Sequence, residues 1–264
     1  MSDGKVLGRY DARSVERMFA DAGVFESIGR RGFSQAEVEV AGTPSALTHT
    51  RLYGRKEGVR HALFDACLTE TTIPEDFFSS RKAAVGRDVR LAVVFWVREQ
   101  DPTREFSSDR PRLPLQTHPG LGILRRVFRV AARMAAELGL DGLANFPKFA
   151  HDAAIFYRSR LFLFLDGHEQ GRFEAMLRDL GPLGLRDMSL AFVGDAVRDE
   201  TNETVAWRPG FQVYPLSAEL SGYFHSEVYA SSVAAAARGA RYRVERARLE
   251  SALRVFEHNV PVAG

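Results

Sequence analysis

Hydrophobic and polar positions alternate along much of the first half of the chain. Residues 35–41 alternate, residues 48–53 and 60–72 follow with a polar turn at 54–58, and residues 89–97 are nearly all apolar. Alternation predicts a strand with one solvated face, whereas an apolar run predicts a central strand covered on both faces. We therefore expect a hairpin from 48–53 and 60–72, and a buried strand at 89–97.

Apolar residues at helical spacing follow. Between residues 123 and 138 one face carries Ile123, Val127, Val130, Ala131, Met134 and Leu138. This spacing predicts an amphipathic helix that ends at Gly139. A short strand-like run at 113–116 precedes it, and a strand at 142–146, a helix at 148–158 and a strand at 161–165 follow it. Alternating strands and helices predict a layered α/β core.

The two ends of the chain are less regular. Ser14 is expected to cap a helix at 15–22, residues 74–88 to be irregular or briefly helical, and residues 99–112 to form a surface loop. Beyond residue 166 we expect helices at 169–180, 219–237 and 242–257, and a hairpin at 196–214. The predicted architecture is an α/β (α+β) core of residues 1–168, with a mixed central sheet flanked by helices. Residues 169–264 form an extension of hairpin and helices packed on the same domain.

The last expected helix carries an apolar stripe beside several arginines. Its members are Tyr242, Leu249, Leu253 and Phe256. Such a stripe is typical of a packing face with solvated flanks. The alternative is an interface, either with a partner or in a homodimer formed through these helices.

Composition excludes several classes of protein. The chain of 264 residues is 45% hydrophobic and has a net charge of +2, so it can form a core but has no overall basic footprint for nucleic acid. Its longest apolar runs are too short to predict a membrane-spanning helix. Cys67 is the sole cysteine, which excludes an intrachain disulfide and fits a reducing compartment. We expect a cytoplasmic protein that binds neither nucleic acid nor membrane.

The turn before the helix at 123–138 is the strongest sign of a binding site. Gly120 and Gly122 lie directly before this helix. The first N–H groups of a helix lack internal partners, and the helix dipole adds partial positive charge there. The arrangement predicts a seat for an anion, most often a phosphate. The alternative is a tight turn that packs helix and strand closely.

Several titratable side chains are candidates for acid–base chemistry. Tyr157 is a candidate general acid, and His151, Glu99 or His118 a candidate base. Each also has a structural interpretation: an anchoring aromatic for Tyr157, a backbone-bonded loop histidine for His118, and a solvated strand end for Glu99, as for Glu70 and Asp101. The histidines are scattered without close ligand spacing, so no metal site is predicted.

The order of elements resembles the GCN5-related N-acetyltransferase superfamily. In that family a central strand leads to an Arg/Gln-x-x-Gly-x-Gly/Ala turn and a long helix, and a later helix carries Tyr-x-x-x-Gly-Phe. Here Thr117-His118-Pro119-Gly120-Leu121-Gly122 and Tyr157-Arg158-Ser159-Arg160-Leu161-Phe162 occupy these places, within residues 89–165.

The resemblance implies acetyl-CoA, or another acyl-CoA, as the co-substrate. The turn formed by Thr117, His118, Gly120, Leu121, Gly122 and Ile123 would hold its pyrophosphate, and Tyr157 would protonate the departing thiolate. Asn145 would lie in the strand near the acyl group. The acceptor would be the amine of a small molecule or peptide, with His151 or Glu99 as its base.

The chain departs from the family pattern in three places. Thr117 stands at the Arg/Gln position, Pro119 removes one N–H from the turn, and Leu161 replaces the glycine. The departures favour a first alternative, a ligand-binding or interaction module that has lost catalysis. A second alternative is unrelated chemistry that uses His118, Gln116 and the loop from Glu99 to Asp101.

Overall fold

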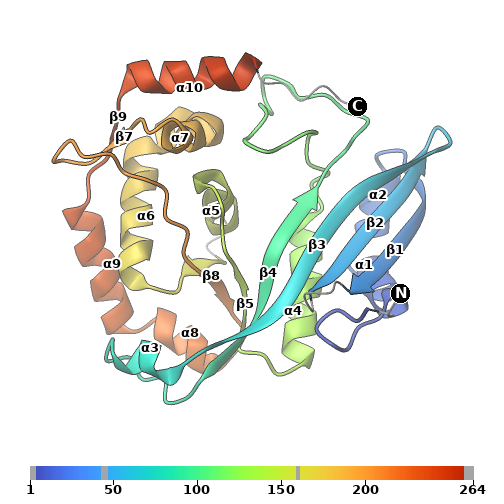
Figure 1. The fold of residues 1–264 in the computed structure, drawn as a ribbon. Helices are drawn as coiled ribbons and strands as arrows, with labels where there is room; N and C mark the ends of the chain where they lie inside the picture. Colours follow the sequence, from blue (N-terminus) through green and yellow to red (C-terminus); the bar gives the residue numbers. More distant parts are fainter. Residues whose placement is uncertain (1–3, 43–46, 159–160, 259–264) are drawn as a thin grey trace.

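A mixed sheet runs through the middle of the molecule and confirms the α/β fold class (Figure 1). The structure is a computed structural model that describes residues 4–42, 47–158 and 161–258. Seven strands pair antiparallel, except for β4 and β5, which are parallel. Across the sheet they are β1 (Ser34–Gly42), β2 (Thr48–Lys56), β3 (Val59–Ile73), β4 (Val89–Glu99), β5 (Gly142–Asn145), β8 (Gln212–Pro215) and β6 (Leu163–Phe164).

The alternating segments form the antiparallel part of the sheet. The predicted hairpin is confirmed as β2 and β3, but its loop is tighter than expected, because Lys56 pairs directly with Val59. Glu57 and Gly58 form the loop with φ of 53° and 79°. A two-residue loop with both φ angles positive matches the twist of the strands that it joins. The apolar run at 89–97 is β4, in the middle of the sheet.

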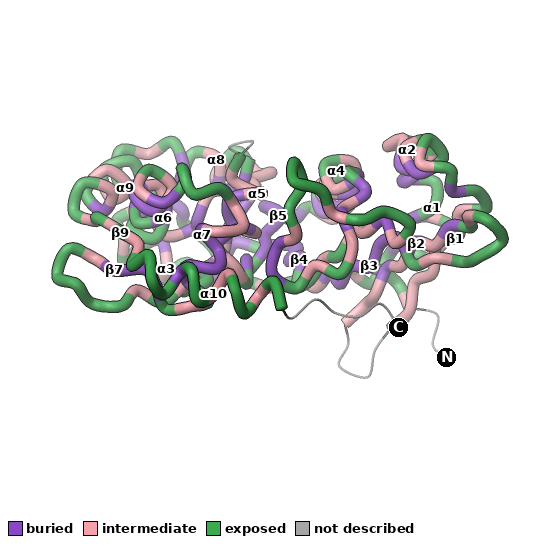
Figure 2. Tube along the Cα trace, turned by 90° about the horizontal axis from the view of Figure 1, so that it is seen from above, coloured by how far each residue is buried: buried purple, intermediate pink, exposed green. Residues whose placement is uncertain are grey.

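Three helices cover one face of this half of the sheet (Figure 2): α1 (Ala12–Asp21), α2 (Val24–Gly29) and α4 (Leu124–Glu137). The predicted face of α4 is buried at Val127, Val130 and Met134, against strand residues that include Leu52 and Phe64. α1 starts earlier than the sequence suggested, because Asp11 rather than Ser14 is its cap and accepts the Ser14 N–H.

The C-terminal part of the chain contributes a strand, β8, to the interior of the sheet. β8 lies between β5 and β6, and the expected division between residues 168 and 169 falls inside α6 (Gly167–Leu180). Around a second core lie α5 (Ala150–Tyr157), α6, α7 (Gly184–Val193) and α10 (Arg246–His258). Among the described residues, no helix combines the length and apolar character needed to cross a membrane.

Several expectations for this part need correction, and one helix was not predicted. Residues 196–214 form a hairpin only at its expected tip, where Arg198 bridges Thr204; beyond it β7 (Val197–Arg198) pairs with β9 (Arg243–Val244), and β8 pairs with β5. Residues 219–237 form two helices, α8 (Ala218–Phe224) and α9 (Glu227–Gly239), because Ser226 caps the second. α7 had no counterpart in the sequence-based prediction. The helix expected at 242–257 starts only at Arg246, so Tyr242 precedes β9 and is not on α10; the stripe is still a packing face, since Leu249 is buried and Leu253 and Phe256 pack against the second core.

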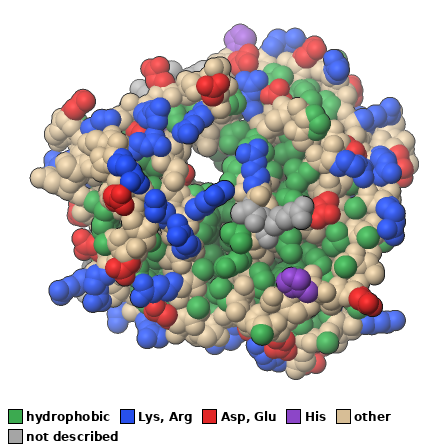
Figure 3. All heavy atoms as spheres, turned by 180° about the vertical axis from the view of Figure 1, so that it is seen from behind, with side chains coloured by type: hydrophobic (Ala, Val, Ile, Leu, Met, Phe, Trp, Pro, Cys, Tyr) green, Lys and Arg blue, Asp and Glu red, His purple; other side chains and the backbone are tan. Residues whose placement is uncertain are grey.

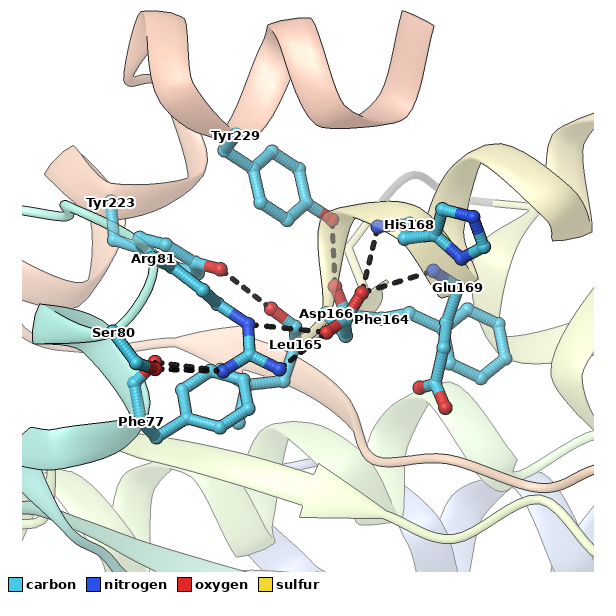
Figure 4. A network of polar contacts seen from close by, with 10 residues as sticks. All are labelled: Phe77, Ser80, Arg81, Phe164, Leu165, Asp166, His168, Glu169, Tyr223 and Tyr229. Atoms are coloured by element: carbon cyan, nitrogen blue, oxygen red, sulfur yellow. Dashed lines mark hydrogen bonds and ion pairs between the residues drawn. The ribbon is translucent and has the colours of Figure 1, made fainter. Parts of the chain in front are cut away.

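A polar cluster joins the helices to β6 (Figure 4). Asp166 caps α6 by accepting the N–H groups of His168 and Glu169, and it also pairs with Arg81, which follows α3 (Glu75–Ser79). Tyr223 donates its hydroxyl to the carbonyl of Leu165, and Tyr229 donates to that of Phe164. These bonds hold α8 and α9 against the edge of the sheet.

Candidate functional site

A cleft opens where β4 and β5 separate. Their pairing ends at Val94 and Asn145, whereas β4 continues to Glu99 with β3 as its partner. The cleft has a volume of about 400 Å³ and is lined by the end of β4, the turn before α4 and the segment between β5 and α5. Seen from behind, an opening passes through the molecule beside a hydrophobic surface (Figure 3). Clefts of this size are typical small-molecule sites.

Segments far apart in sequence contact each other beyond the residues that line the cleft. Arg112 donates to the carbonyl of Phe256 in α10 at 2.6 Å, and its guanidinium lies 4.1 Å from the centre of that ring. α10 packs on α7, and α7 packs on α5. The segment after β4 therefore reaches the helices on the far side of the opening (Figure 1).

The glycine turn forms the expected seat for an anion, and a side chain of the chain itself occupies it. The N–H of Gly122 donates to Glu99 Oε1 at 3.1 Å, and the N–H of Ile123 donates to Oε2 at 2.8 Å. Gly122 has φ of +77°, which favours glycine. A Cβ on Gly120 would lie 3.0 Å from Glu99 Oε1, so this glycine makes room for the carboxylate.

Glu99 lines the cleft and has a perturbed carboxyl pKa. Burial raises the pKa of its carboxyl, while the backbone N–H groups of the turn and the charge of Arg31 oppose the shift. The raised pKa moves the group toward the range in which a general base works at neutral pH. Glu99 is therefore not the solvated strand end of the structural interpretation, unlike Glu70, which pairs with Arg90 at the surface.

The other residues of the predicted turn differ in their contacts and burial. The hydroxyl of Thr117 donates to Gln100, and His118 lines the cleft. Leu121 and Ile123 are buried in the first core, and Arg31 donates to the carbonyl of Leu121. Residues 113–116 form a turn rather than the expected strand, closed by a bond from Gln116 N–H to the carbonyl of Leu113.

His151 lies against the cleft but is held by two partners. Its Nδ1 is 2.8 Å from the hydroxyl of Ser189, and its Nε2 is 3.2 Å from the carboxylate of Asp152. Ser189 is buried, so it is not an accessible nucleophile. Asp152 also accepts the N–H of Phe149 at the start of α5. These contacts fix the imidazole beside the cleft, and the ring forms part of the cleft wall.

Tyr157 lies on the other side of α5, away from the residues that line the cleft. Its hydroxyl donates to Glu174 at 2.9 Å, and its ring packs edge-on against Phe173 in the second core. The helical spacing between His151 and Tyr157 puts the two on different faces, as the sequence indicated. Ser159 and Arg160, which belong to the same predicted motif, lie outside the described residues.

Asn145 and Gln212 are two buried polar residues on neighbouring strands of the sheet. They face each other across β5 and β8, and Asn145 is 3% exposed and lines the cleft. Among the described residues, neither amide atom of Asn145 has a hydrogen-bond partner, nor has Gln212 Oε1. Buried amides without partners are costly and are rare away from functional sites. Gln212 was not predicted, because its place beside β5 depends on long-range pairing.

Metal ligands are not gathered at the site. No group of three His, Cys, Asp or Glu side chains in the described part of the chain is placed to hold a metal ion. Cys67 is buried within β3.

Comparisons with known proteins assign no family to the chain. No family model matches the chain, and no curated protein matches it. A solved structure described as the crystal structure of KacTA-DNA complex is 14% identical, with coverage of 62% of this chain and 80% of that chain. Its TM-score is 0.30, and at this level the likeness carries no argument about function.

Proposed function

We propose that the protein transfers an acyl group from an acyl-CoA to an amine at the cleft between β4 and β5. The observation that supports this proposal is the strand edge of β4 beyond Val94, which faces the cleft after β5 has ended. Such an edge presents N–H and C=O groups to which an extended ligand with amides adds as a further strand. The pantetheine arm of CoA is a ligand of this kind.

The site would work through two groups. The unpartnered amide of Asn145 would donate to the thioester carbonyl after a shift toward the cleft, because both of its polar atoms are buried, and Glu99 would accept the proton of the attacking amine. The amine nitrogen bonds to the carbonyl carbon, the carbon–sulfur bond breaks, and the thiolate leaves. Tyr157, the acid that the resemblance implies for that thiolate, has no part in this proposal, because its hydroxyl donates to Glu174 on the side of α5 away from the cleft.

Binding would require a rearrangement at the glycine turn. The amides of Gly122 and Ile123 are held by Glu99, so the pyrophosphate of CoA must displace this carboxylate. Displacement would also leave Glu99 without its backbone donors and therefore more basic.

A second candidate function is ligand binding without catalysis. The two observations that favour it are the carboxylate of Glu99 in the anion seat and the bond between Tyr157 and Glu174. This alternative predicts that the cleft binds a ligand and does not turn it over.

Thermal unfolding with free CoA and acetyl-CoA, together with release of free thiol in the presence of an amine panel, tests the proposal. A ligand at about 100 times its dissociation constant adds roughly 2.7 kcal/mol of stability. Stabilisation with thiol release supports acyl transfer, and stabilisation alone supports the binding module. If neither free CoA nor acetyl-CoA shifts the melting temperature, the protein neither transfers an acyl group from CoA nor binds CoA without catalysis.

A further inference from the structure

The rim of the cleft exposes apolar side chains where two local distortions of the backbone place them. The first distortion is in β4. Val94 pairs with Leu68 and Trp96 with Cys67, so Phe95 is an extra residue without a partner in β3. Such a bulge redirects a side chain, and bulges are enriched beside active sites. Phe95 lines the cleft and is 62% exposed.

The second distortion is in the segment that faces β4. Leu115 has φ of +64° and stands third in the turn from Leu113 to Gln116, with Pro114 second. Glycine is favoured at a position with this backbone conformation, and a bulky residue is strained there. Leu115 is 72% exposed and lines the cleft. Its backbone is strained and its apolar side chain is exposed to water, and both features are unfavourable for the free protein.

A third apolar side chain continues the same rim. Phe146 follows Asn145 at the end of β5, lines the cleft and is 46% exposed. It rests edge-on against Phe211 at 5.5 Å. Phe95, Leu115 and Phe146, here called the apolar rim, thus lie around the same cleft as the unpartnered amide of Asn145.

We infer that the cleft selects a ligand in which an apolar chain is joined to an amide or thioester head. The head meets the amide of Asn145 and the free edge of β4, and the chain covers the apolar rim. The inference rests on the proposed function and narrows it, since the acyl group transferred would be longer than acetyl. An acyl-CoA and a simple fatty amide both join an apolar chain to a polar carbonyl head, so either could be the ligand. The experiment distinguishes between them.

Calorimetric titration of the full chain with free CoA, acetyl-CoA, octanoyl-CoA and octanamide tests the inference. Each methylene that is fully buried favours binding by roughly fourfold, so octanoyl-CoA is expected to bind at least about tenfold more tightly than acetyl-CoA. Equal affinity for free CoA, acetyl-CoA and octanoyl-CoA would overturn the inference and leave the proposed function standing. Binding of octanamide without binding of any CoA would support the inference and end the proposed function. Failure of octanoyl-CoA and octanamide to bind at all would overturn it.

Leu115→Gly is the decisive variant, because it relieves the backbone strain while it removes the side chain. It is expected to melt at or above the temperature of the parent chain and to lose most of the preference for octanoyl-CoA over acetyl-CoA. Val193→Ala is the matched control, since Val193 is 56% exposed and belongs to α7 rather than to the cleft. Unchanged selectivity in Leu115→Gly would overturn the assignment of the apolar rim. So would an equal loss of selectivity in Val193→Ala.

Discussion

At the scale of single residues, Glu99 carries the most consequence, because it lies where a ligand anion is expected. Its two carboxylate oxygens accept the N–H groups at the start of α4. The same contact that stabilises the helix end in the absence of a ligand therefore competes with a phosphate group for the same donors.

Replacing Glu99 with alanine should separate binding from catalysis. We expect Glu99→Ala to raise the affinity for CoA by about tenfold, because the amides become free. The same variant should lower acyl transfer by roughly 10²-fold or more, because the base is lost. Titration calorimetry and a thiol-release assay measure the two effects. Glu70→Ala is the control, since Glu70 forms a surface pair. A CoA affinity that stays the same in Glu99→Ala would contradict the role of this carboxylate as a competitor.

Under the proposed function, the raised pKa of Glu99 makes CoA binding depend on pH. As the pH falls through this pKa, the carboxyl takes up a proton and becomes a weaker acceptor for the amides. CoA affinity should therefore increase toward acid while the transfer rate falls. The free energy of unfolding should change in the same direction as the affinity. The contribution of Glu99 to this free energy is largest below the ordinary pKa of 4.5 and is lost as the pH rises through the raised pKa. Calorimetry across a pH series, with Glu99→Ala as the reference that lacks this carboxyl, measures the binding effect.

Tyr157 gives a test in the opposite direction. Because its hydroxyl is bonded to Glu174 on the far side of α5, Tyr157→Phe should change the transfer rate by less than about twofold. The variant should lose about 1 kcal/mol of stability with the hydrogen bond. A rate that falls by a hundredfold at unchanged stability would restore the general acid that the resemblance implies.

At the scale of elements, the crossing of α6 and α9 depends on two glycines. A Cβ on Gly171 would lie 2.2 Å from the carbonyl oxygen of Val233, and one on Gly167 would lie 3.0 Å from Ser232. The two glycines stand one turn apart on α6 and let the helices approach closely. A stripe of this kind is invisible to an analysis of apolar periodicity, because glycine adds no apolar side chain.

Gly171→Ala should therefore destabilise the protein by about 1–3 kcal/mol, the usual cost of overpacking. Gly222→Ala in α8 is the matched control, since its Cβ would meet nothing within 4 Å. Alanine favours a helix over glycine, so the control should stabilise by roughly 0.5–1 kcal/mol. Chemical denaturation of both variants measures the difference, and equal effects would show that the crossing is not tightly packed.

The sequence predicted elements well where one face of a strand or helix is buried locally. β1 to β3 follow from alternation, β4 from its apolar run and α4 from helical spacing; the turn at Gly120 and Gly122 was predicted to hold a ligand anion and holds the carboxylate of Glu99. β8 and β7 could not be predicted in this way, since their partners lie far away in the chain. The occupation of the seat by Glu99 was missed for the same reason, because a strand end meets a turn more than twenty residues later only in three dimensions.

At the scale of the whole molecule, two tyrosines tie the C-terminal helices to the sheet. Burial raises the pKa of Tyr223 to about 12 and raises that of Tyr229 further. Both hydroxyls must stay protonated to donate to the carbonyls of Leu165 and Phe164. Their contribution to stability is therefore fully present below their ordinary pKa of 10 and is lost as the pH rises from 10 through the raised pKa of each tyrosine, about 12 for Tyr223 and higher for Tyr229.

We expect an alkaline unfolding transition that begins above about pH 10. Tyr229→Phe should be less stable at pH 8 by about 1–3 kcal/mol, because the carbonyl of Phe164 loses its donor. It should also show a smaller further loss between pH 8 and pH 11, because one ionisation has been removed. Melting curves at the two pH values give both quantities. A parent chain equally stable at both values would contradict the account.

The contact between Arg112 and Phe256 has a consequence for how any substrate arrives. It completes a ring of packed segments around the opening, from β4 through α10 and α7 to α5. A groove accepts a chain laid in from the side, but a ring accepts only what can be threaded end-first. A free amine at the tip of a slender arm satisfies this condition, whereas the middle of a folded polypeptide does not. Cross-section, in addition to chemistry, would then decide which acceptors react.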